Sequence, residues 1–379
     1  MPSLSDTIAR LSRIRGMAQS GSHTVDEGRL TDLPSFGSNP GDLHAKMYVP
    51  GHLADRPALV VVLHGCTQTA GSYNLGSGWS ELADKHGFVL LFPEQQRRNN
   101  PNLCFNWFSP EDSRRGAGEA LSVRQMIDAM ISRHAIDPAR VFVTGLSAGG
   151  AMTSVMLATY PEVFAGGAII AGLPYGCAST IPQAFDRMRG HGGGSESELA
   201  AAVRRASDHL GPWPTISVWH GSGDATVNPS NADAIISQWR GVHGVAAVPT
   251  RTEAIDGYPR RVWCDDQGHE VIEEYSITGM GHGTPLDTFG DDGCGRSGAY
   301  MLEASISSTR HICQFWGLTG AVDRTECSRA SQRPAHPRLV VASEPMNLGR
   351  TGERAEAQIR TAGVGKIIED ALRAAGLMR

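Results

Sequence analysis

The sequence predicts an α/β fold built around a mostly parallel central sheet with helices on both faces. Two observations predict it. Continuous apolar runs rich in β-branched residues recur along the chain, with residues 58–65 (ALVVVLHG) the clearest of them. Such runs are typical of strands that are buried on both faces of a sheet. Helical patterns separate the runs, and this alternation indicates parallel strands joined by right-handed crossovers.

The expected strands follow one another closely enough for a single large domain. A partly alternating segment at residues 43–50 begins the series. Further strands are then expected at residues 58–65, 88–94, 140–145, 166–172, 215–221 and 271–282. The last of these alternates more than the others, so we expect it at an edge of the sheet. Helices are expected between the strands, at residues 76–87, 118–136, 148–162 and 228–242.

Three segments lie outside this alternation and divide the chain. Residues 1–42 should form a short helix, from about Asp6 to Met17, and a polar arm, and residues 43–318 should form the α/β domain itself. Within that domain, residues 173–214 are longer than a simple crossover and are expected to pass over the carboxyl edge of the sheet as a lid.

Residues 319–379 form a C-terminal extension that ends in an expected amphipathic helix. Six side chains could share one apolar face of it: Ile359, Ile367, Ile368, Ala371, Leu372 and Ala375. We expect this face to pack on its own domain, and a contact between copies in a homo-oligomer is the alternative.

The composition excludes several classes of protein. The formal net charge of -5 is too small to indicate a nucleic-acid partner, and no apolar run is long enough to span a membrane. The N-terminus has no continuous apolar segment of the kind found in secretory signals, which predicts a cytoplasmic protein, or a secreted one if the chain is a processed form. The seven cysteines include no CxxC pair, so we expect no zinc site and mainly reduced thiols.

A serine, an aspartate and a histidine each follow a different expected strand. Ser147 lies in the sequence GLSAG at 145–149, Asp224 in HGSGDATVNP at 220–229 and His282 in GMGHG at 279–283. Active sites of such sheets collect at the carboxyl ends of the strands. The order Ser, Asp, His along the chain is that of the α/β-hydrolase fold.

These residue types form a known catalytic arrangement. A serine hydroxyl needs a base to take its proton, a histidine can do so near neutral pH, and a carboxylate fixes the tautomer of that histidine. The small residues around Ser147 meet the demands of a tight turn between strand and helix. The backbone N–H groups of Cys66 and Ala148 are expected to form the oxyanion hole. This chemistry requires neither a metal nor a cofactor.

Each assignment has alternatives in the sequence. Asp224 could be an ordinary turn residue, and Asp256, Asp265 and Asp266 compete with it. The competing histidines are His220, His269 and His311, whereas His64 is expected to support the oxyanion loop by hydrogen bonding.

Longer motifs resemble a known family. The sequences LHGCTQTAGSY, FPEQ, CFNWF, RVFVTGLSAGGAMT, AGLPYGCA, HGSGDATVNPSNADAI and ISSTRHICQFWGL, between Met47 and Leu318, are similar to those of the polyhydroxybutyrate depolymerase type esterases. The resemblance implies the same three catalytic residues and the same oxyanion donors. It also implies a disulfide between Cys66 and Cys104, the alternative being two free thiols in a reducing compartment.

The resemblance implies a serine carboxylic-ester hydrolase that acts through an acyl-enzyme. Its expected substrates are hydroxyalkanoate polyesters, their oligomers or related short-chain esters. A carbohydrate esterase that releases ferulate or acetate is the alternative within the family. A catalytically inactive binding protein on the same fold is the alternative from another class. Family members that degrade extracellular polyester often carry a separate polymer-binding domain, and no part of this sequence resembles one, which favours a soluble ester or short oligomer.

Overall fold

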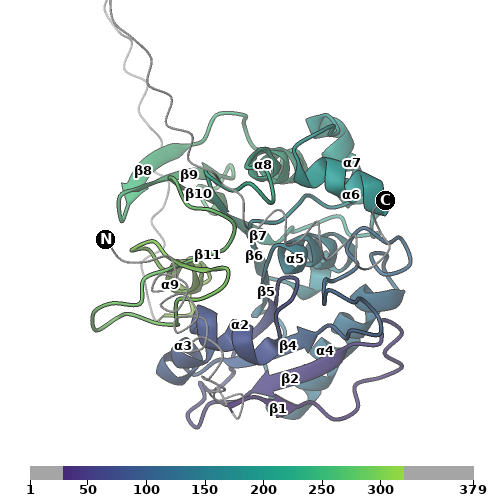
Figure 1. Ribbon diagram of the computed structural model, residues 1–379, viewed down its shortest axis with the longest axis vertical. Helices are drawn as coiled ribbons and strands as arrows, with labels where there is room; N and C mark the ends of the chain where they lie inside the picture. Colours follow the sequence, from purple (N-terminus) through teal and green to yellow (C-terminus); the bar gives the residue numbers. More distant parts are fainter. Residues whose placement is uncertain (1–28, 320–379) are drawn as a thin grey trace, which may run out of the picture.

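A computed structural model describes residues 29–319 and contains one large sheet of ten strands, in the order β1-β2-β4-β3-β5-β6-β7-β10-β9-β8 (Figure 1). Its strands are β1 (Thr31–Asp32), β2 (His44–Tyr48), β3 (Leu59–Leu63), β4 (Val89–Glu94), β5 (Val141–Leu146), β6 (Gly166–Ile170), β7 (Thr215–Gly221), β8 (Arg251–Ile255), β9 (Tyr258–Cys264) and β10 (Glu270–Ile277). A second, two-stranded sheet pairs β11 (Thr284–Leu286) with β12 (Met301–Glu303).

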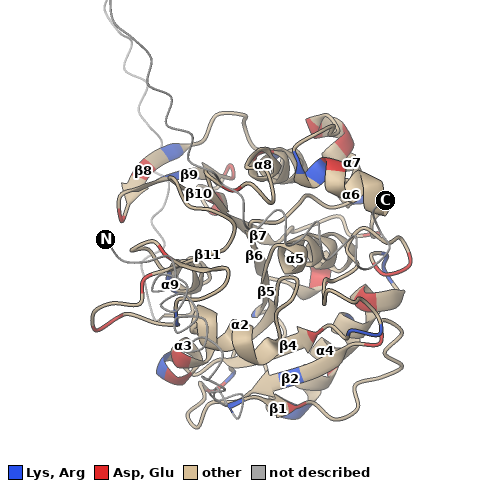
Figure 2. Cartoon of the chain, viewed as in Figure 1, with Lys and Arg blue, Asp and Glu red and all other residues tan. Residues whose placement is uncertain are grey.

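The six central strands, from β4 to β10 in the sheet order, run parallel, and antiparallel strands flank them at both ends. The predicted fold class, a mostly parallel sheet of the α/β-hydrolase type with helices on both faces, is confirmed. The strands of its centre, β5, β6 and β7, carry no charged residue, whereas outer elements such as β8 do (Figure 2).

Helices cover both faces of the sheet. They are α2 (Ala70–Ser77), α3 (Trp79–His86), α4 (Gly118–His134), α5 (Ala148–Thr159), the 3₁₀ helix η2 (Pro161–Val163), α6 (Ile181–Met188), α7 (Glu196–Arg205), α8 (Ser230–His243) and α9 (Ser308–Phe315). The side chains of β3 alternate between the two apolar cores. Leu59, Val61 and Leu63 belong to the core that includes residues of α4, α5, α7 and α8, and Val60 and Val62 belong to the core that includes residues of α2, α3 and α9. Burial on both faces explains why the sequence of β3 is a continuous apolar run.

The expectation that residues 271–282 form an edge strand is wrong. The strand β10 lies between β7 and β9, and the hairpin of β8 and β9 continues the sheet beyond it. The polar side chains that suggested an edge are neutralised across the strands: the buried Glu273 accepts hydrogen bonds from Arg260 Nε at 2.8 Å and from Ser217 Oγ at 2.7 Å.

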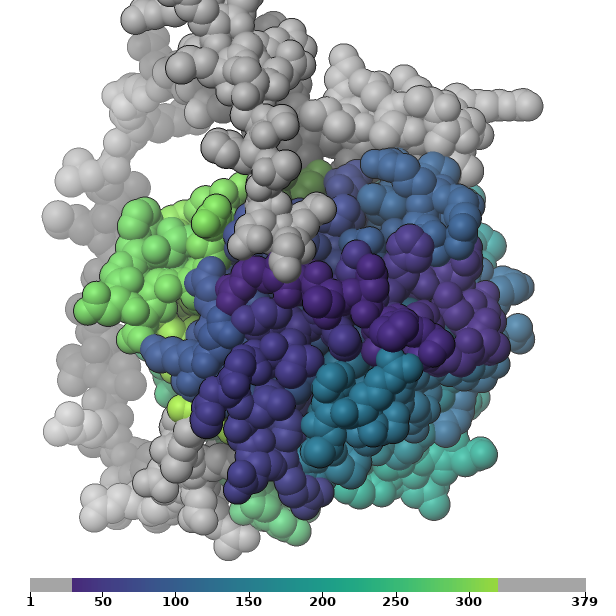
Figure 3. Space-filling view, turned by 90° about the horizontal axis from the view of Figure 1, so that it is seen from below, coloured from purple at the N-terminus to yellow at the C-terminus, as the bar shows by residue number. Residues whose placement is uncertain are grey.

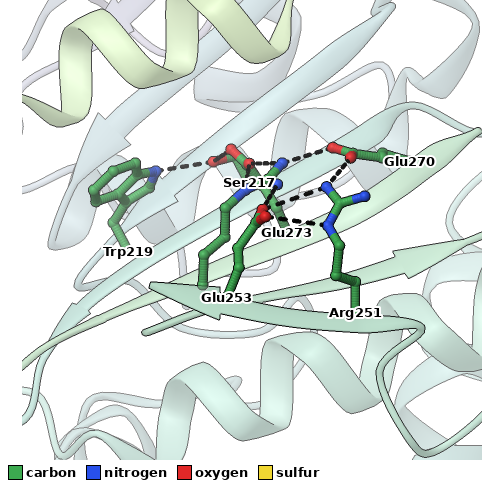
Figure 4. A network of polar contacts seen from close by, with 7 residues as sticks. Ser217, Trp219, Arg251, Glu253, Glu270 and Glu273 are labelled. Atoms are coloured by element: carbon green, nitrogen blue, oxygen red, sulfur yellow. Dashed lines mark hydrogen bonds and ion pairs between the residues drawn. The ribbon is translucent and has the colours of Figure 1, made fainter. Parts of the chain in front are cut away.

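A network of charged side chains fixes this hairpin to the sheet (Figure 4). Arg260 of β9 is 8% exposed and contacts Glu253 at 2.5 Å, Glu270 at 2.6 Å and Glu273 at 2.7 Å. Arg251 adds ion pairs to Glu253 and Glu270. Buried ion pairs gain little net stability because desolvation offsets their attraction, but loss of one partner leaves an uncompensated charge. The network therefore joins β8 and β9 to β10, and removal of one partner would leave a buried charge unpaired.

The segment 173–214 contains α6 and α7 and packs beside α8. The buried Gln238 of α8 donates hydrogen bonds to the carbonyls of Tyr175 and Leu199, at 2.9 and 3.0 Å. At the other end of α8, the N–H of Asn228 donates to Met188 O at 2.7 Å. These bonds join the segment to the loop that follows β7. Its role as a lid stays a prediction.

The described part of the arm before β2 packs against α4. Figure 3 shows the first described residues, in purple, lying across one face of the molecule. The N–H groups of Asn39 and Gly41 donate to side chains of α4, to Gln125 Oε1 at 2.9 Å and to Ser122 Oγ at 2.8 Å. The expected helix near Asp6 and the amphipathic face of the C-terminal extension lie outside the described residues. No helix within residues 29–319 has the length and apolar character needed to cross a membrane.

Candidate active site

Ser147 stands on the turn between β5 and α5 in an unusual backbone conformation. Its φ is 57° and its ψ is -116°, a region that costs energy for any residue with a Cβ. The turn is held on both sides, since the Ser147 N–H donates to Ile170 O at 2.9 Å and the Ser147 carbonyl accepts from Ala151 N at 2.8 Å. The surrounding sheet and helix thus hold the serine at the end of its strand.

Close backbone contacts explain the glycines beside the serine. A Cβ on Gly149 would lie 2.3 Å from Leu63 O and 2.5 Å from His64 O, and a Cβ on Gly145 would lie 2.4 Å from Gly149 O. These are backbone atoms that cannot move aside. Any side chain at 145 or 149 would push α5 away from the ends of β3 and β5.

The structure brings Ser147, His282 and Asp224 into one hydrogen-bonded chain. His282 Nε2 lies 2.9 Å from Ser147 Oγ, and His282 Nδ1 lies 2.7 Å from Asp224 Oδ2. Because an ionised carboxylate only accepts hydrogen bonds, Nδ1 carries the ring proton. The lone pair of Nε2 is then directed at the serine hydroxyl, as a general base requires.

The loops that carry the acid and the histidine are joined by their backbones. Strands β7 and β10 are neighbours and end together, with Gly221 opposite Ile277. Beyond them, Ser222 N donates to Ile277 O at 3.0 Å and Gly223 N donates to Met280 O at 2.9 Å. A Cβ on Gly221 would lie 2.3 Å from Met280 O, so only glycine permits this contact.

The carboxyl of Asp224 is almost fully buried and is held by four groups. Oδ1 accepts from the N–H groups of Thr226 and Val227, at 2.8 and 2.9 Å. Oδ2 lies 2.7 Å from His282 Nδ1 and 3.3 Å from His220 Nε2. Burial opposes ionisation, but the hydrogen bonds from both histidines and from Val227 outweigh it and lower the pKa of Asp224. The acid is therefore a carboxylate at neutral pH.

The competing aspartates and His269 and His311 lie apart from this group. Asp265 pairs with His269 at 3.2 Å, Asp256 pairs with His311 at 2.8 Å, and Asp266 is exposed. His220 has a place that the sequence did not predict. It is 3% exposed, and its Nε2–H is shared between Val227 O at 2.9 Å and the carboxylate of Asp224 at 3.3 Å. The feature of the sequence that could have indicated this contact was the position of His220 four residues before Asp224.

The expected oxyanion donors leave the sheet side by side. Leu63 of β3 pairs with Gly145 of β5, so the residues that follow these two strands are neighbours. Among the described residues, neither the Cys66 N–H nor the Ala148 N–H has a hydrogen-bond partner, and both are free to bind an anionic oxygen. Ala148 is also the first residue of α5, where the helix dipole favours negative charge.

Cys66 forms a disulfide with Cys104, as the family resemblance implied. The expectation of mainly reduced thiols is therefore wrong for this pair, because two segments 38 residues apart place their side chains in contact. Three other cysteines of the described chain, Cys177, Cys294 and Cys313, are free.

His64 supports the same loop, as expected. It is 1% exposed, its Nδ1–H donates to Gly65 O at 2.8 Å, and its Nε2 accepts from Gln95 N at 3.1 Å. Burial lowers the pKa of His64 to about 4. The imidazole is therefore neutral and structural. Within residues 29–319, no three His, Cys, Asp or Glu side chains are arranged to hold a metal ion.

Comparison with known proteins gives a consistent result. The family described as "Esterase PHB depolymerase" matches residues 43–255. Poly(3-hydroxyalkanoate) depolymerase C of Paucimonas lemoignei is 47% identical over 293 residues, which cover 77% of this chain and 70% of the relative. Feruloyl esterase B of Talaromyces stipitatus is 33% identical over 273 residues, 70% of this chain and 75% of the relative.

Carbohydrate esterases also appear among the relatives and the solved structures. The acetylxylan esterase of Coprinopsis cinerea is 34% identical over 268 residues, 69% of this chain and 71% of the relative. The structure of an acetyl xylan esterase from Aspergillus awamori superposes with a TM-score of 0.65 at 27% identity, covering 76% of this chain and 99% of that one.

Proposed function

The chain belongs to the family of PHB depolymerase type esterases and is a carboxylic-ester hydrolase, and on that premise we propose that Ser147, His282 and Asp224 are its catalytic triad. The observation that carries this proposal is the hydrogen-bonded chain from Ser147 Oγ through both nitrogens of His282 to Asp224. The two unpartnered N–H groups of Cys66 and Ala148 support their role as the oxyanion hole.

The proposed reaction has two halves with one tetrahedral intermediate each. Ser147 Oγ attacks the acyl carbonyl while its proton moves to His282 Nε2, and the carbonyl oxygen becomes an anion held by the two N–H groups. The C–O bond of the ester breaks, the alcohol leaves with the proton from His282, and an acyl-enzyme remains. A water then gives a proton to His282 and attacks the acyl carbon. The bond between the acyl carbon and Ser147 Oγ breaks, His282 returns the proton to Oγ, and the acid is released. Asp224 stabilises the imidazolium in both halves.

The proposed substrates are short-chain hydroxyalkanoate esters, as oligomers or polyester. The higher identity to the depolymerase, 47% against 33% and 34% for the feruloyl and acetylxylan esterases, supports this choice. A carbohydrate esterase is the second candidate. It is favoured by the acetyl xylan esterase structure, since this chain spans 99% of that protein at a TM-score of 0.65.

A substrate panel and a covalent probe test the proposal together. We expect a fluorophosphonate to label Ser147, and we expect faster release of 3-hydroxybutyrate from its oligomers than of ferulate or acetate from carbohydrate esters. Faster release of ferulate or acetate would show that the second candidate function, a carbohydrate esterase, is the correct one. If the folded protein hydrolysed no ester and Ser147 stayed unlabelled, we would conclude that the chain is a catalytically inactive binding protein.

The Cys66–Cys104 disulfide supports a location in an oxidising compartment, in place of the cytoplasmic one expected from the N-terminus. In that case the two cysteines should resist alkylation in protein taken directly from its native source. Peptide mass spectrometry after alkylation measures this, and full alkylation of both thiols would contradict the proposed location.

A further inference from the structure

Glu119 is a buried carboxyl group to which the mechanism gives no role. It lies in the first turn of α4 and is 0% exposed. Four N–H groups converge on it. Oε1 accepts from Gln95 Nε2 at 2.6 Å, from Asn106 Nδ2 at 2.8 Å and from Asn99 Nδ2 at 3.3 Å, and Oε2 accepts from Asn106 N at 2.9 Å. An amide at this position would place a donor where one of these N–H groups points, so the four contacts favour a carboxyl group over an amide.

The first connection from Glu119 leads to the oxyanion loop, residues 64–68, through Gln95. Gln95 directly follows β4, next to the end of β3, and is 3% exposed. Its side chain donates to Glu119, while its backbone N–H donates to His64 Nε2. His64 in turn donates to Gly65 O, one residue before the Cys66 N–H.

The second connection leads to the same loop through the disulfide. Gln95 Nε2 also donates to the carbonyl of Cys104, at 3.0 Å, and Cys104 is covalently joined to Cys66. The neighbouring residues are paired as well, since Thr67 N donates to Asn102 O at 2.7 Å. Both connections meet at Cys66, whose N–H would face the oxyanion.

We propose that Glu119 is a positioning residue that fixes the position of the oxyanion loop through Gln95. Gln95 contacts the loop by two routes, one through His64 and one through the Cys66–Cys104 disulfide. The proposal rests on the proposed function, because it assumes that the Cys66 N–H binds the oxyanion. An oxyanion donor must lie within a narrow range of distances from the developing charge, so a small displacement of the loop slows the chemical step without weakening substrate binding.

The electrostatic cost of Glu119 agrees with such a role. Burial and, next, the charge of Asp112 raise the pKa of Glu119 to about 8, although the hydrogen bonds from Asn106 and Gln95 act in the opposite direction. A carboxyl whose pKa is raised on folding stabilises the fold most at acidic pH, and that contribution is lost as the pH rises through about 8. At neutral and alkaline pH the group costs stability, so stability alone does not explain its place.

The test compares Glu119→Gln with a matched control, Glu273→Gln. Glu273 is also a buried carboxyl group, but it belongs to the charge network of the β8–β9 hairpin (Figure 4). Active sites are counted by end-point fluorophosphonate labelling, and kcat is expressed per labelled site. We expect Glu119→Gln to lower kcat about 10-fold with KM changed less than 2-fold. Glu273→Gln should lower the midpoint of thermal unfolding but keep kcat per site.

A second variant, Gln95→Leu, breaks the same connection and leaves Glu119 in place. It should also lower kcat, and the double variant should be no slower than the slower single variant, because both act on one loop. Unchanged kcat per labelled site in Glu119→Gln or Gln95→Leu would overturn the proposal, as would an equal loss in Glu273→Gln. The proposed function fails separately, if the wild-type protein is not labelled at Ser147.

Discussion

Ser147→Ala should reduce kcat for p-nitrophenyl butyrate by about 10⁵- to 10⁶-fold while the protein stays folded. The substitution removes only Oγ, the atom that lies 2.9 Å from His282 Nε2. Alanine, like serine, has a Cβ, so the turn at φ 57° carries similar strain in both proteins. The remaining activity over water would come from the oxyanion hole and from binding. Initial rates measure the loss, and near-ultraviolet circular dichroism verifies the fold.

Ser154→Ala is the matched control for this experiment. Ser154 lies on α5, the helix that begins directly after Ser147, is fully buried and donates to Leu173 O at 2.8 Å. Its loss should cost about 1 kcal/mol of stability and leave kcat near the wild-type value. Ser147→Ala protein that kept more than one hundredth of the wild-type kcat would show that another group is the nucleophile.

Asp224→Asn should reduce kcat by about 10⁴-fold, although the side chains are the same size. The N–H groups of Thr226 and Val227 hold one side-chain oxygen, so the new amide nitrogen would face His282 Nδ1. Its N–H would then donate to Nδ1 and move the ring proton to Nε2. With a proton on Nε2, His282 cannot accept the proton of Ser147. The pH dependence of kcat/KM and the proton signals of the imidazole measure the change of tautomer.

Asp265→Asn is the comparison for the acid, because Asp265 is paired with a histidine elsewhere on the surface. It should keep nearly full activity, since a partly exposed pair of this kind contributes little. If Asp265→Asn lost activity and Asp224→Asn kept it, the acid would have been assigned to the wrong loop.

The sequence by itself predicted the residues of the proposed site and determined the core of the fold. Residues 58–63 and 141–143 are apolar throughout, as strands buried on both faces require, and these runs predicted the parallel sheet. The residues 145–149 are a local pattern whose glycines are required, because a Cβ added at either would lie 2.3 to 2.5 Å from backbone atoms. Ser147, Asp224 and His282 each follow a different expected strand. Because parallel strands end at one edge of the sheet, the sequence predicted that the three side chains lie close together.

Only the tertiary structure decided which groups support those residues. His220 lies beside Asp224, Gln95 joins Glu119 to His64, and β10 lies inside the sheet because Arg260 and Arg261 pair with its glutamates. Apart from His220, these contacts join residues from 13 to 31 positions apart on different elements. No local pattern encodes them, because a buried polar side chain is stable wherever the fold supplies its partners, and the sequence alone does not show which partners meet.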